Sequence, residues 1–222
     1  MSKTKIKISI VINILVFILT IVASIIMFTG FKFMHGPSPN VESTSIGMFR
    51  FFTVDSNIFM GIIALVFAIF EIKLLKENIK EIPFVLYILN LVATSAVGLT
   101  FVVVFTYLGP ICKDGIITML QNSNLFFHLI IPVFAMVNFV VFERTSIIRF
   151  KHCFFGTIPM LLYSACYLTN VLVHSENGKV STDYDWYWFV QGGLWQACIV
   201  VPVIFIASYV ITIILWRLNK KR

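Results

Sequence analysis

Charged residues are scarce in this sequence of 222 residues. They make up 12% of the chain, which is about half the share usual in a soluble globular domain. Hydrophobic residues make up 59%, and the mean hydropathy is +0.95. A chain of this composition would expose large apolar patches in water. The composition therefore excludes an ordinary soluble fold and indicates a protein of the lipid bilayer.

The sequence also lacks the motifs that hold metals and cofactors. Its four cysteines form no Cys-x-x-Cys pair and have no histidine at metal-ligand spacing, so we expect neither a zinc site nor a disulfide framework. No nucleotide or haem motif is present, and we expect no cofactor. The net charge of +7 does not indicate nucleic-acid binding, because the basic residues flank the apolar segments. The cysteines are Cys112, Cys153, Cys166 and Cys198.

Six apolar segments are long enough to cross a bilayer, which takes about 20 residues in a helix. Segments rich in turn-forming, polar or charged residues separate them. We therefore predict an all-α membrane protein with a single domain over residues 1–222, built as a bundle of six transmembrane helices. The predicted spans are roughly 8–31, 51–72, 84–108, 123–142, 155–173 and 193–216.

The distribution of lysine and arginine predicts the orientation of the bundle. Thirteen of them lie at the termini and in the loops of one side, and four lie on the other side. Positive residues concentrate on the cytoplasmic side, so we expect a protein of the plasma membrane with both termini in the cytoplasm. Glu143 and Arg144 are expected to form a charged pair at the cytoplasmic boundary. The four residues of the other side are Lys32, Arg50, Lys113 and Lys179.

Two of the predicted spans carry polar residues close to their outer ends. Thr53 lies about one turn into the second span, and His128 lies about one turn into the fourth. With a rise of 1.5 Å per residue, both lie ~5–8 Å inside the apolar boundary. Polar groups are costly in hydrocarbon, usually face the bundle interior and often mark a functional site. The two spans thus place a hydroxyl and an imidazole at one level of the membrane.

Helical spacing adds polar neighbours to each of these residues. Ser56 and Asn57 share a face with Thr53, and Asn124 shares a face with His128, because residues three or four apart lie on one side of a helix. A histidine can take the proton of a hydroxyl and activate it as a nucleophile, and an amide can donate to an oxyanion. Thr53 and His128 are therefore candidate catalytic residues. Asn57, Asn124 and Ser56 are candidates for steadying the oxyanion or orienting the groups.

The same residue types also serve as interhelical hydrogen-bonding groups in membrane bundles. On that alternative, the chain is a non-enzymatic membrane protein such as a small transporter, a lipid-binding protein or an accessory subunit. Many transporters have duplicated halves and helices broken near the midplane, and neither is visible here. Asp55 is expected to face away from Thr53, and near the membrane boundary it could pair with Arg50 or another basic group.

An aromatic cluster at residues 186–189 ends the longest predicted loop, on the outer side. Aromatic rings commonly anchor a protein at the membrane interface, which is one interpretation of the cluster. The loop also lies on the same side as the polar start of the second span. Trp186, Tyr187 and Trp188 are therefore candidates for a substrate-facing lid, and the sequence leaves both interpretations open.

Two short motifs resemble the androgen-induced-gene family of six-pass membrane hydrolases. They are Phe51-Phe52-Thr53-Val54-Asp55 at the start of the second span and the histidine before Pro132 in the fourth. Uncharacterised bacterial relatives share Phe-Phe-Thr-x-x-Ser-Asn and Leu-x-x-His-x-x-x-Pro, which stand here at 51–57 and 125–132. The eukaryotic members are threonine hydrolases that cleave fatty acid esters of hydroxy fatty acids.

The resemblance implies that this chain hydrolyses a lipid ester, with membrane lipids as its partners. It implies Thr53 as the nucleophile and His128 as the general base. The outer loop departs from the family pattern, because it lacks the Tyr-Pro-Phe sequence that many relatives carry before the sixth span. The resemblance therefore leaves the substrate open.

Overall fold

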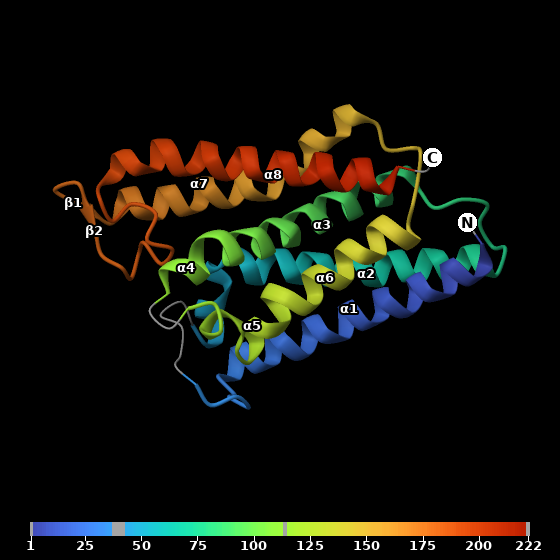
Figure 1. Cartoon of the computed structure of the whole chain (residues 1–222), viewed down its shortest axis with the longest axis horizontal. Helices are drawn as coiled ribbons and strands as arrows, with labels where there is room; N and C mark the ends of the chain where they lie inside the picture. The colour runs from blue at the N-terminus through green and yellow to red at the C-terminus, as the bar shows by residue number, and fades with distance from the viewer. Residues whose placement is uncertain (1, 37–42, 113–114, 221–222) are drawn as a thin grey trace.

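The computed structural model describes residues 2–36, 43–112 and 115–220 (Figure 1). Within these residues, six helices are long and apolar enough to cross a membrane, which confirms the predicted all-α bundle. Each predicted span overlaps one of them. The fourth has the predicted bounds, and the ends of the others differ by at most five residues. The helices are Lys3–Thr29, Phe52–Leu75, Phe84–Ile111, Ser123–Phe142, Phe150–Val173 and Leu194–Asn219.

The first, second and sixth spans are built around the long helices α1 (Lys3–Thr29), α2 (Phe52–Leu75) and α8 (Ala197–Asn219). The side chain of Ser2 accepts a hydrogen bond from the Lys5 N–H and so caps the start of α1. The same helix ends at Gly30, whose φ of 70° is in the left-handed region that glycine adopts without strain. Local sequence thus explains both ends of α1.

The other three spans contain irregular turns. The third joins α3 (Phe84–Val103) through a π-helical turn to α4 (Gly109–Ile111). The fourth consists of α5 (Ser123–Leu125), a π-helical turn over Phe126–Ile130, α6 (Ile131–Val137) and a second π-helical turn over Asn138–Phe142. The fifth begins as a 3₁₀ helix over Phe150–Thr157 and continues as α7 (Ile158–Val173). The loop after it forms a two-stranded antiparallel hairpin of β1 (Ser175–Glu176) and β2 (Lys179–Val180).

Helix α3 lies at the centre of the bundle. It contacts α2 and α6 on one side and α7 and α8 on the other (Figure 1). Residues 90–100 of α3 are all buried, as expected for a helix surrounded by others. The polar residues among them therefore need partners inside the bundle.

Helices α1 and α2 pack closely because Gly61 faces Thr20 where they cross. A Cβ atom at Gly61 would lie 2.9 Å from the Thr20 side chain, which leaves no room for a larger residue. The Thr20 hydroxyl donates to the Val16 carbonyl at 2.8 Å, so it needs no partner on α2. Small residues allow such an approach between membrane helices.

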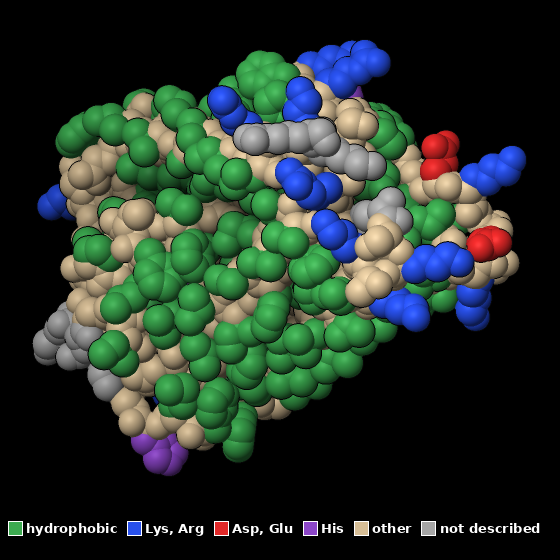
Figure 2. Space-filling view, turned by 45° about the vertical axis from the view of Figure 1, so that its right-hand side comes forward, with side chains coloured by type: hydrophobic (Ala, Val, Ile, Leu, Met, Phe, Trp, Pro, Cys, Tyr) green, Lys and Arg blue, Asp and Glu red, His purple; other side chains and the backbone are tan. Residues whose placement is uncertain are grey.

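Both termini lie at one end of the bundle, as an even number of spans requires (Figure 1). Lysine and arginine side chains gather at this end in Figure 2. The assignment of this end to the cytoplasm stays a prediction from the charge distribution. Lys113, Lys221 and Arg222, which entered that prediction, lie outside the described residues.

Candidate functional site

Thr53 lies in the first turn of α2, at the end of the bundle away from the termini. No side chain caps this helix start. Val54 and Asp55 donate to the Phe51 carbonyl and so begin the helical hydrogen bonding. The N–H groups of Phe52 and Thr53 precede these bonds, so they are available to other acceptors.

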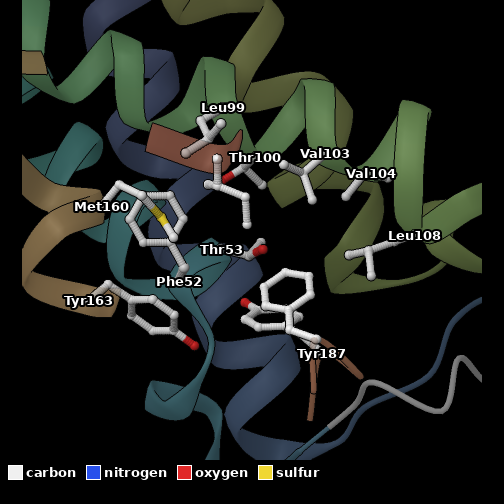
Figure 3. Close-up of a pocket in the computed structure, with 12 residues that line it drawn as sticks. Phe52, Thr53, Leu99, Thr100, Val103, Val104, Leu108, Met160, Tyr163 and Tyr187 are labelled. Carbon is white, nitrogen blue, oxygen red and sulfur yellow. The ribbon is translucent and has the colours of Figure 1, made fainter. Parts of the chain in front are cut away.

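The hydroxyl of Tyr187 occupies this helix start, next to the hydroxyl of Thr53 (Figure 3). Burial raises the pKa of Tyr187 to about 12, although hydrogen bonding by Tyr163, by the Thr53 hydroxyl and by the N–H groups of Phe52 and Thr53 opposes this rise. Tyr187 therefore stays a neutral phenol at physiological pH. In that state its oxygen can accept from an N–H group and its proton can be donated.

His128 lies in the π-helical turn over Phe126–Ile130. Pro132 follows this turn and has no N–H to donate to the His128 carbonyl, which favours a departure from the regular helix. The Nδ1 atom of His128 is 2.7 Å from the Met119 carbonyl. A carbonyl only accepts, so Nδ1 carries the proton and Nε2 of the neutral ring keeps a lone pair. Within the described residues, no hydrogen bond engages Nε2.

The structure brings Thr53 and His128 to one small cavity, which Asn124 and Tyr187 also line. The cavity contains about 10 Å³ of free space, close to the least that admits one water molecule. No direct hydrogen bond joins Thr53 to His128 in the described part of the chain. A hydroxyl, an imidazole and an amide nevertheless share one enclosed space.

Asn124 supplies a free donor to this cavity. Its side chain is 3% exposed, and its Nδ2 atom is buried without a hydrogen-bond partner. An unpaired buried amide is costly, so such groups are rare in folded proteins. The unused N–H groups of Asn124 are available to a negatively charged oxygen bound beside Thr53.

Asn57 and Ser56 donate their polar hydrogens to backbone carbonyls and not into this cavity. Asn57 Nδ2 donates to the Thr53 carbonyl at 2.7 Å and to the Phe127 carbonyl at 3.1 Å. The Ser56 hydroxyl donates to the Thr53 carbonyl at 3.1 Å and lies 3.2 Å from the hydroxyl of Thr100 on α3. Asn57 thus ties the backbone of Thr53 to the residue before His128, which positions the two helices relative to each other.

Asp55 faces away from this cavity. It lines a separate groove of about 510 Å³, formed largely by residues of α2 and α7. Arg50 lines the same groove, but no ion pair joins it to Asp55 among the described residues, so the predicted pairing is wrong. The guanidinium carbon of Arg50 lies instead 5.0 Å from the ring centre of Phe51 and 5.7 Å from that of Trp186.

A second cavity beside Thr53 is almost entirely apolar (Figure 3). It contains about 30 Å³ of free space. Phe52 and Tyr163 line both this cavity and the groove, and their ring centres lie 5.3 Å apart in an edge-on arrangement. This aromatic pair therefore separates the Thr53 hydroxyl from the groove. The apolar residues of the cavity are Phe52, Leu99, Val103, Val104, Leu108, Met160, Phe189 and Ile204.

The three aromatic residues of the predicted lid, Trp186, Tyr187 and Trp188, lie in different places. Tyr187 lines both cavities beside Thr53, while Trp186 lines the groove and donates from Nε1 to the Tyr163 hydroxyl at 2.9 Å. Trp188 lines neither the cavities nor the groove, and its φ of 58° is unusual for a large side chain. The lid interpretation thus fits the position of Tyr187 better than that of its neighbours.

Asp185 anchors this loop, and sequence analysis did not identify it. Its carboxylate accepts hydrogen bonds from the Phe189 and Val190 N–H groups at 2.9 and 3.0 Å, and from the Tyr167 hydroxyl. The side chain is 1% exposed. An acidic residue inside an aromatic run was the one signal in the sequence that could have marked it.

Replacing Asp185 with alanine is expected to loosen the loop over the site. Each buried group that loses its partner costs about 1–3 kcal/mol. The Phe189 and Val190 amides should then exchange with deuterium at least about tenfold faster, since 1.4 kcal/mol corresponds to a factor of ten. Hydrogen exchange followed by mass spectrometry measures this. Asp183→Ala, an exposed residue of the same loop, is the control, and equal effects of both changes would contradict the anchoring role.

No family model, curated protein or solved structure matches this chain.

Proposed function

We propose that this protein hydrolyses a lipid ester within the membrane, with Thr53 as nucleophile and His128 as general base. The observation that supports this most is the enclosed cavity lined by both residues. His128 has the tautomer a base needs, because its Nδ1 proton is held by the Met119 carbonyl. The resemblance of the motifs around Thr53 and His128 to a family of threonine hydrolases supports the same reaction.

In the proposed reaction, Nε2 of His128 takes the Thr53 proton, directly or through one water, as the hydroxyl oxygen bonds to the acyl carbon. The carbonyl oxygen becomes negatively charged in the tetrahedral intermediate. When this collapses, the ester bond breaks and the alcohol leaves with the proton from His128. Water then attacks the acyl-enzyme with the help of His128, which releases the fatty acid and restores Thr53.

The oxyanion would form beside two donors. Asn124 Nδ2 is unpaired and lines the cavity, and the neutral Tyr187 hydroxyl lies beside Thr53. Preorganised donors of this kind stabilise the charge that develops in acyl transfer. Asn57 and Ser56 already donate to backbone carbonyls, so we assign them an orienting role.

The groove and the apolar cavity favour a lipid as the substrate. The cavity beside Thr53 offers hydrocarbon surfaces for an acyl chain. The groove between α2 and α7 is large and carries Arg50, whose Nε is buried without a partner and could pair with an anionic group of the lipid. Movement of the Phe52 and Tyr163 rings would connect the two. In the predicted orientation, this site lies near the outer surface of the plasma membrane.

A fluorophosphonate probe tests the nucleophile. Detergent-purified protein is expected to be labelled at Thr53, as mapped by mass spectrometry, and Thr53→Ala or His128→Ala should abolish the labelling. Thr100→Ala is the matched control, because its hydroxyl lines the apolar cavity and has no histidine beside it. Labelling that survives both Thr53→Ala and His128→Ala would overturn the assignment.

A lipid-binding protein without turnover is the second candidate. The groove of about 510 Å³ favours it, as do the interhelical bonds of Ser56 and Asn57, which such a protein would also need. A lipid that copurifies and is retained unchanged on prolonged incubation, equally in the native protein and in Thr53→Ala, would support this candidate over hydrolysis.

A further inference from the structure

A second polar cluster lies in the other half of the bundle, near the termini. Glu71 is eighteen residues beyond Thr53 on α2, which is about 27 Å along the helix. The cluster joins four of the six spans, and each member is at most 2% exposed. We call it the carboxyl cluster. Its members are Ser9 and Asn13 on α1, Glu71 on α2, Asn90 on α3, and Asn138 and Glu143 at the end of the fourth span.

The sequence predicted that Glu143 forms a charged pair with Arg144 at the membrane boundary, and the structure shows no such pair among the described residues. The side chain of Glu143 turns into the bundle and is 1% exposed, while Arg144 donates to the carbonyls of Leu218 and Lys220. The bundle interior supplies enough donors to hold a carboxylate here. The predicted pair is therefore wrong, because Glu143 accepts hydrogen bonds from buried amides and does not bind Arg144.

The hydrogen bonds of Glu143 are those of an ionised carboxylate. Its Oε1 accepts from Asn13 at 2.7 Å, from Asn138 at 2.8 Å and from Ser9 at 3.2 Å. Its Oε2 accepts from Asn90 at 2.6 Å. Four donors directed at one carboxylate favour its charged form.

Glu71 has the opposite surroundings. Its Oε2 accepts from the same Asn13 amide at 3.2 Å, and its Oε1 is buried without a partner. Asn138 Oδ1 is a second buried oxygen without a partner, although the amide nitrogen of the same residue binds Glu143. Two acceptors thus lack a donor within one cluster.

No basic residue forms an ion pair with Glu71 or Glu143 in the described ranges. A second negative charge beside Glu143 would be buried in an apolar bundle without compensation, which costs several kcal/mol. A proton on Glu71 Oε1 removes this charge and converts an unpaired acceptor into a donor. One added proton therefore removes both the uncompensated charge of Glu71 and the unpaired acceptor at its Oε1 atom.

The cluster lies close to water at the end of the bundle that holds the termini. A cavity of about 610 Å³ opens there, lined by Tyr87 together with Lys5, Lys80, Glu81 and Arg144. Phe142 and Arg144, the residues on either side of Glu143, also line this cavity, so the cluster lies next to it. Among the titratable residues of the surrounding segments, Glu143 of the fourth span belongs to the cluster. Lys5 of α1, Tyr87 of α3 and Glu81 of the loop before α3 line the cavity instead.

We propose that Glu71 and Glu143 form a proton-binding site that exchanges with this cavity. A proton from water binds Glu71 Oε1 and changes the charge of the pair from two negative charges to one. No covalent bond other than the O–H bond forms or breaks. The site is independent of Thr53 and would function whether or not the protein is a hydrolase.

Infrared difference spectroscopy in lipid vesicles tests this proposal. When the buffer is changed from acidic to alkaline, the native protein should lose one C=O stretching band of a protonated carboxylic acid in apolar surroundings. Glu71→Gln should show no such loss, because glutamine cannot release a proton. Glu81→Gln, which changes an exposed carboxyl group near the same cavity, should retain it. Circular dichroism of each variant verifies that it is folded.

Either of two outcomes would overturn the proposal. The band could be absent from the native protein at every pH. Alternatively, Glu71→Gln could lose the band on the change to alkaline buffer as the native protein does, which would show that the proton lies on another group.

Discussion

Thr53→Ala is expected to lower the turnover of a lipid ester by about 10⁴–10⁶-fold. Removing the nucleophile of a hydrolase that acts through a covalent intermediate leaves only binding and oxyanion stabilisation, and losses of this order are known for such changes. The measurement is the release of fatty acid from a fluorogenic ester by protein reconstituted in vesicles. Because the groove and the apolar cavity proposed to bind the lipid remain in place, the Michaelis constant should change much less than the turnover number.

Two controls accompany this measurement. Thr53→Ser keeps a hydroxyl at the same position and should retain part of the activity. Thr100→Ala removes a hydroxyl from the apolar cavity and should retain most of it. If Thr53→Ala hydrolysed the ester as fast as the native protein, Thr53 would not be the nucleophile, and the non-enzymatic alternative would gain support.

Glu143→Ala is expected to lower the free energy of unfolding by about 2–5 kcal/mol. An interhelical hydrogen bond in a membrane bundle contributes about 0.6 kcal/mol on average, and a charged acceptor roughly doubles this. Glu143 accepts from four buried donors on three different spans, and all four would lose this acceptor. Denaturation in detergent micelles, followed by circular dichroism, measures the change.

The charge and the hydrogen bonds of Glu143 can be separated. Glu143→Gln removes the charge but keeps one acceptor oxygen, so it should destabilise less than alanine. Glu77→Ala removes an exposed carboxylate that pairs with Lys3 at 3.4 Å and should change the stability by no more than about 0.5 kcal/mol. Equal effects of Glu143→Ala and Glu77→Ala would contradict the anchoring role of Glu143.

The sequence alone was sufficient to predict the six spans and the level of Thr53 and His128. Hydropathy is a local property, and the thickness of the bilayer sets the length of each apolar run. The rise of an α-helix then converts residue number into depth, which placed the two residues at one level. The π-helical turn around His128 changes the predicted depth of His128 by less than one helical turn, so the two residues stay at a similar level.

Helical spacing predicted which residues share a face but not what their side chains bind. Asn57 and Asn124 looked equivalent in the sequence, since each lies four residues from a candidate catalytic group. In the folded chain, Asn57 donates to two carbonyls, whereas Asn124 lines the cavity and its Nδ2 atom is buried without a partner. The difference arises because a carbonyl of the π-helical turn, that of Phe127, comes within reach of Asn57.

The sequence by itself determined the membrane class, the six spans and one pair of candidate catalytic residues at a common depth. Only the tertiary structure decided that Tyr187 from the outer loop lies against Thr53, that Asp185 holds that loop, and that Glu143 turns inward to meet Asn13. The physical reason is the range of the interactions. Hydropathy and helical rise act over one segment, whereas a hydrogen bond between residues 130 positions apart depends on how helices pack.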